Sequence, residues 1–438
     1  MIPLEKAIKQ VIGESGPLGF ENLPINQCYG RILAKTVKSE TGIPRFNTAA
    51  IDGYAISAEG FTPTRGSKPK QFEVEGECKP GKPYMGELPE GKAVKISAGM
   101  RLPDGTDTVV KFEDVARTDS DNLNVYAGIR PGQNIIQAGR EVAPGEDLMP
   151  AGRVLNSADL ARLAEAGFLE VDVHKKPVVG IVSVGDEYLS EDIDDSTPGI
   201  SRKQFLSSLI LENGAEVAHI GACSDSVDQL RETLESTEGY DDLVILAGQS
   251  IEDYNFLKSA FRELNVDLGF WRVAIKPGKS VLYGKYKEHP AFGVTGNLWS
   301  VAVIFNQLLK PLLAHQTGLR DTKRLEVIAR LTKELYTNPS MTHIFKAVVR
   351  IDSNGFTATP ILNSQMGELR SLSIANGFII IPPDVNQVRA GDKVRVEVLG
   401  PLKIDKNEKK DTPRKNNQPK HNHRKKSGNR RNYNSYRY

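Results

Sequence analysis

The feature that most constrains the fold of this chain is an alternation of strand-like and helix-like segments between residues 177 and 318. Apolar runs such as VVGIVSVG (178–185) and DDLVILAG (241–248) alternate with amphipathic runs such as SRKQFLSSLILENG (201–214). Strands that are apolar on both faces are typical of parallel sheets covered by helices on each side. The alternation therefore predicts a three-layer α/β domain with a parallel sheet.

The remaining regions show other patterns. Apolar residues at helical spacing in 4–12 predict an N-terminal helix, and SADLARLAEAGF (157–168) predicts a second helix with Ser157 as its N-cap. Short alternating runs separated by Gly and Pro predict two β units. We therefore expect a multidomain α/β protein with these parts: a helical linker domain (1–43 and 139–176), an inserted β domain (44–138), the α/β domain (177–320) and a C-terminal β-barrel or sandwich (321–402).

The C-terminal residues 403–438 differ from the rest in charge. They contain 13 Lys and Arg against 3 Asp and Glu, whereas the whole chain carries a net charge of +2, so the preceding residues carry −8. Few aliphatic residues are present, and such a segment cannot bury a core. It predicts a disordered basic tail, either a solvated appendage or an electrostatic contact to nucleic acid or acidic proteins.

Composition excludes several classes of protein. The longest apolar runs are far shorter than the roughly 20 residues that cross a bilayer, so no membrane association is expected. The three cysteines are far apart and form no CxxC motif, which argues against a disulfide framework or a zinc site. These features favour a cytoplasmic location.

Ligands of open parallel sheets bind beyond the carboxyl ends of the strands. Glycine and serine before a helix leave backbone N–H groups for an anion, lysines add positive charge, and acids can hold a divalent cation. The same residue types also form ordinary turns, and KPGK recurs at 79–82, where we expect only a turn. Five segments are expected at this edge: SVGDEY (183–188), ACSDSVD (222–228), AGQSIEDYN (247–255), KPGK (276–279), which follows an expected strand at 272–275, and TGNLWS (295–300).

Motifs spread over the first 402 residues resemble those of one family. The chain is similar to the molybdopterin molybdotransferases, the MoeA and gephyrin E-domain family, in the order and spacing of these motifs. The motifs are PRFNTAAIDGYAI (44–56), SVGDE (183–187), DDLVILAGQS (241–250), FWRVAIKPGKSVLYG (270–284) and TGNLWSVAVIFNQLLKPLLAHQTG (295–318).

The resemblance implies an activity and an assembly. Members of the family insert molybdate into adenylylated molybdopterin, with Mg²⁺ as cofactor and AMP as the released product. They are usually homodimers with the active site between subunits, and their substrate comes from a molybdopterin-adenylyltransferase-type protein. The resemblance also implies that the C-terminal region is a β-barrel.

The resemblance also assigns roles to individual residues. Asp52, Glu187, Asp225 and Lys276 match catalytic positions, and Glu187 and Asp225 would hold the Mg²⁺ ion. Asp52 would reach the site of the partner subunit. The positions that match ligand-binding residues are Gly248, Ser250, Arg272, Lys279, Gly296, Asn297 and Ser300.

The sequence departs from the family motifs within the site. In the third segment, Gln249 and Glu252 replace two glycines of the family motif, and Asn255 replaces an aspartate. Basic residues stand where the family has an acid, and the fifth segment lacks both prolines of its motif. Two functions therefore remain open: an active molybdotransferase, or a catalytically degenerate dimeric scaffold that binds a ligand or partner. The substituted positions are Ala98, Glu141, Arg202, Lys203, Gln249, Glu252, Asn255, Thr295 and Leu298.

Overall fold

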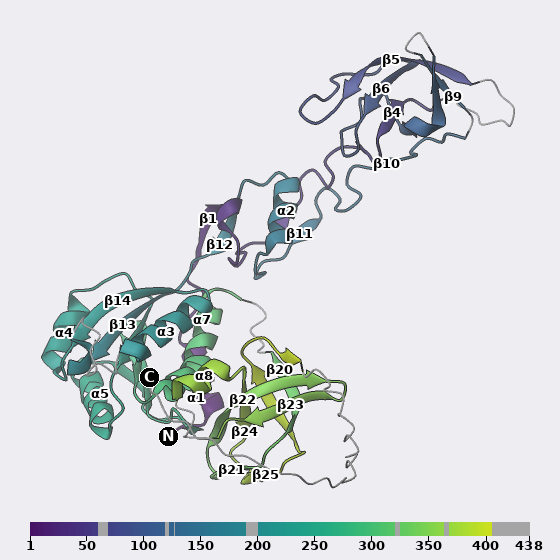
Figure 1. Ribbon diagram of the computed structural model, residues 1–438. Coiled ribbons are helices and arrows are strands. Elements are labelled where there is room, and N and C mark those ends of the chain that lie inside the picture. The colour runs from purple at the N-terminus through teal and green to yellow at the C-terminus, as the bar shows by residue number, and fades with distance from the viewer. Residues whose placement is uncertain are drawn as a thin grey trace, which may run out of the picture.

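The computed structural model describes residues 1–59, 69–118, 122–126, 128–189, 200–319, 325–362 and 368–404. Figure 1 shows an elongated molecule. The α/β part and a C-terminal barrel lie together at one end, a small β unit lies at the other end, and a narrow segment connects them. Within the described ranges, no helix is long and apolar enough to span a membrane.

A six-stranded sheet forms the centre of the α/β part, with the strand order β14-β13-β15-β19-β18-β16. The first four strands run parallel, as expected, but β18 is antiparallel to both of its neighbours. The strand bounds are β13 (Val178–Val184), β14 (Glu216–Cys223), β15 (Asp242–Leu246), β16 (Asp267–Phe270), β18 (Val281–Tyr286) and β19 (His289–Val294).

A strand expected at 272–275 does not join this sheet. The segment instead forms β17 (Ile275–Lys276), which pairs in parallel with the long barrel strand β22 (Thr342–Asp352). The neighbouring strands β18 and β19 form a hairpin through Lys287 and Glu288, which both have a positive φ. Two positive φ angles are the geometry of a tight hairpin turn, and this turn explains why β18 reverses direction.

Helices cover both faces of the sheet, which gives the predicted three layers. Alternate residues of β13 enter different cores: Val179 and Ile181 face one cluster, and Val182 and Val184 face the other. The helices around the sheet are α1 (Leu4–Gly13), α3 (Ile200–Glu212), α4 (Val227–Glu235), α5 (Ile251–Glu263), α6 (Leu298–Ile304), the π-helical η4 (Phe305–Leu309) and α7 (Lys310–Gln316).

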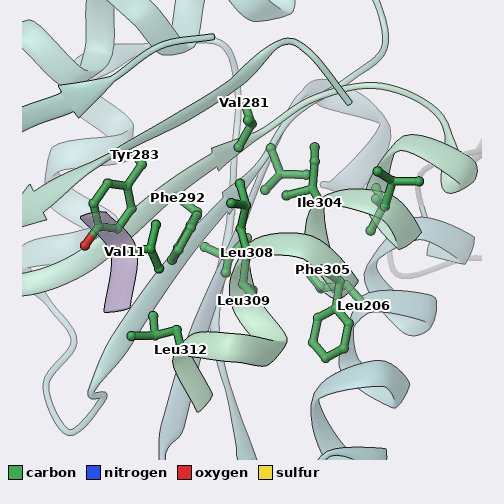
Figure 2. Close-up of a cluster of buried hydrophobic side chains, with 14 of the residues drawn as sticks. Val11, Leu206, Val281, Tyr283, Phe292, Ile304, Phe305, Leu308, Leu309 and Leu312 are labelled. Carbon is green, nitrogen blue, oxygen red and sulfur yellow. The ribbon is translucent and has the colours of Figure 1, made fainter. Parts of the chain in front are cut away.

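The N-terminal helix α1 belongs to this core. Its buried residues Leu4, Ala7 and Val11 lie in the same cluster as Tyr283 and Leu312, and Figure 2 shows Val11 beside the sheet and the α7 region. The helix forms where it was expected, but it does not pack with residues 139–176, with which we had grouped it. Apolar spacing predicts a helix and its buried face, whereas it does not identify the distant surface that covers that face.

The connecting segment has its own small core. It contains two short antiparallel sheets and α2, whose N-cap is Asn156 rather than Ser157 because Asn156 and Asp159 form a capping box. The elements are β1 (Phe20–Pro24), η1 (Ile25–Gln27), β2 (Val37–Lys38), β11 (Asp147–Met149), α2 (Ser157–Glu165) and β12 (Glu170–His174).

The distal β unit is built around a six-stranded sheet, with the order β7-β4-β6-β5-β9-β8, and a two-stranded sheet of β3 and β10. Its described apolar residues form two clusters. The elements are β3 (Thr48–Ala49), β4 (Gly53–Ile56), β5 (Lys70–Cys78), β6 (Lys92–Ile96), β7 (Thr108–Lys111), η2 (Phe112–Asp114), β8 (Val115–Arg117), β9 (Asn122–Val125) and β10 (Ile135–Ile136).

The C-terminal part is a closed barrel, which decides between the two expected architectures. Strands β22, β23, β20, β26 and β24 pair in sequence, and β24 closes the ring on β22. The first two residues of the expected tail form β27 (Lys403–Ile404), which pairs with β22, and residues 405–438 lie outside the described residues. The other elements are β20 (Glu326–Leu331), β21 (Leu335–Tyr336), β23 (Gly355–Pro360), α8 (Glu368–Ile374), β24 (Gly377–Ile381), β25 (Gln387–Val388) and β26 (Lys393–Val398).

A buried carboxyl group lies at the amino end of β15. Asp242 is 2% exposed; its Oδ1 accepts a hydrogen bond of 2.8 Å from Gln316 Nε2, and its Oδ2 has no partner among the described residues. Gln316 also donates to Ser15, so the contact joins α7 to the segment after α1. Burial raises the pKa of Asp242 to about 7.

This raised pKa predicts a pH-dependent stability. Protonated Asp242 stabilises the fold fully below the pKa of the unfolded chain, near 3.9, and this contribution is lost as the pH rises towards about 7. We expect Asp242→Asn to be more stable than the wild type at pH 8, by at most about 4 kcal/mol, with the difference disappearing towards pH 4. Urea unfolding at several pH values measures it, with the exposed Asp228→Asn as control. A difference that does not change with pH would contradict the assignment.

Candidate functional site

The five predicted segments meet at one edge of the sheet. Val184 pairs with Cys223, Leu246 pairs with Val294, and Val281 also pairs with Val294. Neighbouring segments are also joined by backbone hydrogen bonds, from Gly185 N to Cys223 O (2.9 Å) and from Gly296 N to Gly248 O (3.0 Å). Four segments follow the carboxyl ends of the parallel strands, and the fourth precedes the amino end of the antiparallel β18, so all five meet at the expected edge.

The first segment places a glutamate against an arginine. Glu187 lies in the short helix η3 (Asp186–Tyr188) and folds back over Gly185, which has a φ of 131° and where any Cβ atom would collide with the Glu187 carboxylate. Glu187 Oε1 accepts a hydrogen bond of 3.1 Å from Arg202 Nη2 in α3. The carboxylate that was expected to bind a metal ion is thus paired with a guanidinium group.

Arg202 is the most deeply buried cation of this region. The residue is 3% exposed, and its Nη1 donates to the carbonyl oxygens of Ala247 (3.1 Å) and Gly296 (3.5 Å). Its guanidinium also lies over the ring of Tyr188, 5.5 Å from the centroid. Burial raises the pKa of the Tyr188 phenol to about 12, so the phenol stays protonated at neutral pH.

Further acids lie near Glu187. Partial desolvation, followed by the negative charges of Asp253, Glu187 and Asp186, raises the pKa of Asp225. The carboxylates of Asp225 and Glu187 are therefore near enough for their charges to interact.

The third segment is mostly helix. α5 begins at Ile251, so Glu252, Asp253 and Asn255 lie on the helix, and Asn255 is exposed. A capping box closes its first turn: Ser250 Oγ accepts from Asp253 N (3.0 Å), and Asp253 Oδ2 accepts from Ser250 N (2.6 Å). Gly248 lacks a side chain at the place where the Asp253 carboxylate approaches the backbone. The chain's own carboxylate therefore occupies this helix terminus.

The fifth segment is closed in a similar way. Asn297 is the N-cap of α6, and its Oδ1 accepts from Ser300 N and from Ser300 Oγ, both at 3.0 Å. Glu368, from α8 of the barrel part, accepts a hydrogen bond of 3.0 Å from Trp299 N. Gly296 has a φ of 106°, a conformation that favours glycine. These contacts use the N–H groups that the sequence suggested for an anion.

The basic residues of the site are exposed. Lys276 is in β17 beside the barrel strand β22, and the Lys279 carbonyl accepts a hydrogen bond from Val273 N (3.1 Å). The Arg272 guanidinium lies over the Tyr254 ring of α5, 5.1 Å from the centroid. The KPGK at 79–82 is an ordinary turn, as predicted, in which Lys79 and Lys82 exchange backbone hydrogen bonds. Only the second KPGK lies at the edge of the α/β sheet where the five segments meet.

Asp52 is not brought to the site within one chain. It precedes β4 in the distal β unit, where its Oδ1 accepts a hydrogen bond of 2.8 Å from Ala98 N. Figure 1 shows this unit at the end of the molecule away from the α/β part. The next residue, Gly53, lies so close to the Val110 carbonyl that no side chain fits, which fixes the loop that carries Asp52.

A cavity of about 450 Å³ opens beside Arg202. It lies among the start of α3, the third segment, the start of α6, and α8. Its lining residues are Ser201, Arg202, Gln249, Leu298, Glu368, Leu369 and Arg370. A larger hollow of about 1330 Å³ lies between α1 and the barrel. No residue of the five segments is among those that line it, and Ala274, just before the fourth segment, is the nearest to them in the sequence.

Three consecutive family models match the chain. They are the MoeA N-terminal region over residues 2–167, a probable molybdopterin binding domain over 180–315, and the MoeA C-terminal region over 329–399. Their order and extent account for nearly all described residues. The chain belongs to the MoeA family.

Relatives and solved structures agree with this assignment. The molybdopterin molybdenumtransferase of Bacillus subtilis is 28% identical over 91% of this chain and 94% of its own length, and that of Haemophilus influenzae is 27% identical over 92% and 100%. Two crystal structures of MoeA from Pyrococcus horikoshii have TM-scores of 0.78 and 0.71 at 29% and 28% identity. They cover 92% and 91% of this chain and all of those chains.

Sequence reasoning missed several residues of this MoeA site. The sequence marks Arg202 only as a departure from the family motif. It places Tyr188 in the first segment without a role, and it gives no sign that Glu368 belongs to the site. Arg202 of α3 meets Glu187 of the first segment only in the folded protein. A local sequence pattern does not show this contact. Glu368 comes from the barrel part, and no spacing in the sequence connects it to Trp299.

The capping contact predicts how Asn297 acts. Replacing it with alanine removes the acceptor of two hydrogen bonds at the start of α6, and we expect a loss of about 1 kcal/mol in the free energy of unfolding. Asn297→Ser retains an N-cap oxygen and should lose only a few tenths. Chemical denaturation of both variants measures the difference. Equal losses in the two variants would show that the cap does not stabilise the helix.

Proposed function

We propose that this chain is a molybdotransferase of molybdenum cofactor biosynthesis, which inserts molybdate into adenylylated molybdopterin and releases AMP. The observation that supports it most strongly is the extent of the match to the MoeA family, which includes the five segments at the carboxyl edge of the sheet. The named molybdenumtransferases match over the same length. Molybdopterin and molybdate are therefore substrates in this proposal.

The charges of the site suit an anionic substrate. Lys276, Lys279 and Arg272 are exposed on neighbouring segments, and the cavity beside Arg202 adds a second arginine, Arg370. Lysine binds phosphate as a point charge and arginine binds it through parallel N–H groups. These residues would hold the phosphate of the substrate and the incoming oxyanion by charge, while the rigid strand ends keep the two ligands adjacent.

The Mg²⁺ ion implied by the resemblance does not fit the residues present. Among the residues that the structure describes, no group of three or more His, Cys, Asp or Glu side chains is placed to hold a metal ion. Glu187 is paired with Arg202, and Asp253 is used as a helix cap. In this proposal the basic residues of the site act by binding and orienting the substrates, without a Mg²⁺ ion.

Assembly completes the proposal. Asp52 lies in the distal β unit, away from the α/β part of its own chain, so we propose a cytoplasmic homodimer in which this unit reaches the α/β part of the partner subunit. An adenylyltransfer reaction must supply the substrate, and a molybdopterin-adenylyltransferase-type protein is the expected partner. Contacts of the basic tail to nucleic acid or acidic proteins stay a prediction.

An assay with the purified full chain tests the function. With adenylylated molybdopterin and molybdate, we expect release of AMP and formation of active cofactor. Lys276→Ala should weaken substrate binding by about 1.5–3 kcal/mol, the range for a hydrogen bond to a charged group, as measured by calorimetry. Lys79→Ala, in the identical KPGK turn of the distal β unit, is the matched control and should change nothing. Binding without turnover by the wild type would favour the degenerate scaffold.

Mixing of variants tests the shared site. At substrate concentrations below the weakened affinity, Asp52→Ala and Lys276→Ala should each have little activity alone, and light scattering should show both as dimers. If each site combines Asp52 of one subunit with Lys276 of the other, random mixing of equal amounts leaves about a quarter of the sites intact. Recovery of activity to about that fraction supports the proposal. No recovery after subunit exchange would show that no site combines Asp52 of one subunit with Lys276 of the other, and would overturn the shared site.

A further inference from the structure

The side chain of Arg202 occupies a set of oxygen atoms that is typical of a cation site. Its guanidinium is bonded to a carboxylate oxygen of Glu187 and to the backbone carbonyls of Ala247 and Gly296. These three oxygens come from the first, third and fifth segments, at the carboxyl ends of three parallel strands. Carboxylate and carbonyl oxygens are the ligands that hard cations such as Mg²⁺ and Ca²⁺ take from proteins.

The arginine is held there by burial as well as by charge. Its side chain is 4% exposed, and Tyr188 covers one face of the guanidinium. Arginine remains charged at all physiological pH values, so the charge at this position is permanent. A divalent ion bound to Glu187 would lie next to that charge, and neither the arginine nor the ion would then keep its ligands.

The positive charge of Arg202 also borders a cavity. Arg202 Nε is buried and has no hydrogen-bond partner among the described residues. Arg202 also lines the cavity of about 450 Å³, together with Gln249 and Arg370. Because the side chain borders the cavity, its charge acts on any anionic group that binds there.

We propose that Arg202 is a tethered cation that replaces a divalent metal ion at this site. It neutralises Glu187, joins the first, third and fifth segments, and presents positive charge to the substrate, so that substrate binding does not depend on Mg²⁺. Arg202 is a positioning residue in this role. The inference deepens the proposed molybdotransferase function, but metal binding can be measured without turnover.

Binding of Mn²⁺, followed by electron paramagnetic resonance on the full chain, tests the proposal. Any Mn²⁺ binding by the wild type should be unchanged in Glu187→Gln and in Asp225→Asn, because these carboxylates do not bind the ion in the wild type. Arg202→Gln frees Glu187 beside Asp225 and Asp253, and it should bind Mn²⁺ at least tenfold more tightly than the wild type. The double variant Arg202→Gln/Glu187→Gln should lose this binding. Arg202→Lys retains the charge and should behave as the wild type.

Lys203→Gln is the matched control, because it removes one positive charge from the next residue of the same helix and should also behave as the wild type. Mn²⁺ bound by the wild type and lost in Glu187→Gln or Asp225→Asn would overturn the proposal, whether or not Arg202→Gln folds. A folded Arg202→Gln that gains no Mn²⁺ binding would also overturn it. An inactive wild type with the expected Mn²⁺ results would remove only the proposed function.

Discussion

The lateral pairing of four parallel strands is the constraint on which the other features depend. The last residues of these strands, β14, β13, β15 and β19, pair with one another or lie one residue apart. The segments that follow the four strands therefore lie at one edge of the sheet. Apolar residues on both faces of these strands bury against helices, so the sheet cannot shift without exposing a core. The barrel is attached to this frame by β17, which pairs with β22 beside the same edge.

The polar groups at that edge are largely satisfied by the chain itself. Asp253 and Glu368 accept from the first turns of α5 and α6, and Arg202 donates to oxygens of three segments. Buried polar groups without partners are costly, so these contacts keep the edge ordered before any ligand arrives. The exposed lysines of the KPGK turn then carry the charge that is available to a ligand.

The sequence predicted those features that depend on local periodicity. Alternating segments gave the α/β layers, apolar spacing gave α1, and the strand ends gave the five segments of the site. It failed where a distant contact decides the outcome, as for the surface that covers α1 and for Glu368 at α6. It also missed the reversal of β18, because Lys287 and Glu288 adopt a hairpin turn without the usual Gly or Asn. The ligand of Glu187 was predicted as a metal ion because a local motif does not show that Arg202 lies opposite.

The position of α1 has a consequence for synthesis of the chain on the ribosome. Leu4, Ala7 and Val11 pack against residues of β16, β18 and α7, so the full set of their partners exists only when the chain has been made as far as residue 316. At common translation rates this takes roughly 15–60 s. The connecting segment and the distal β unit contain their own cores and are complete long before then. A nascent chain that stops before residue 316 therefore has an apolar first helix whose docking surface is incomplete.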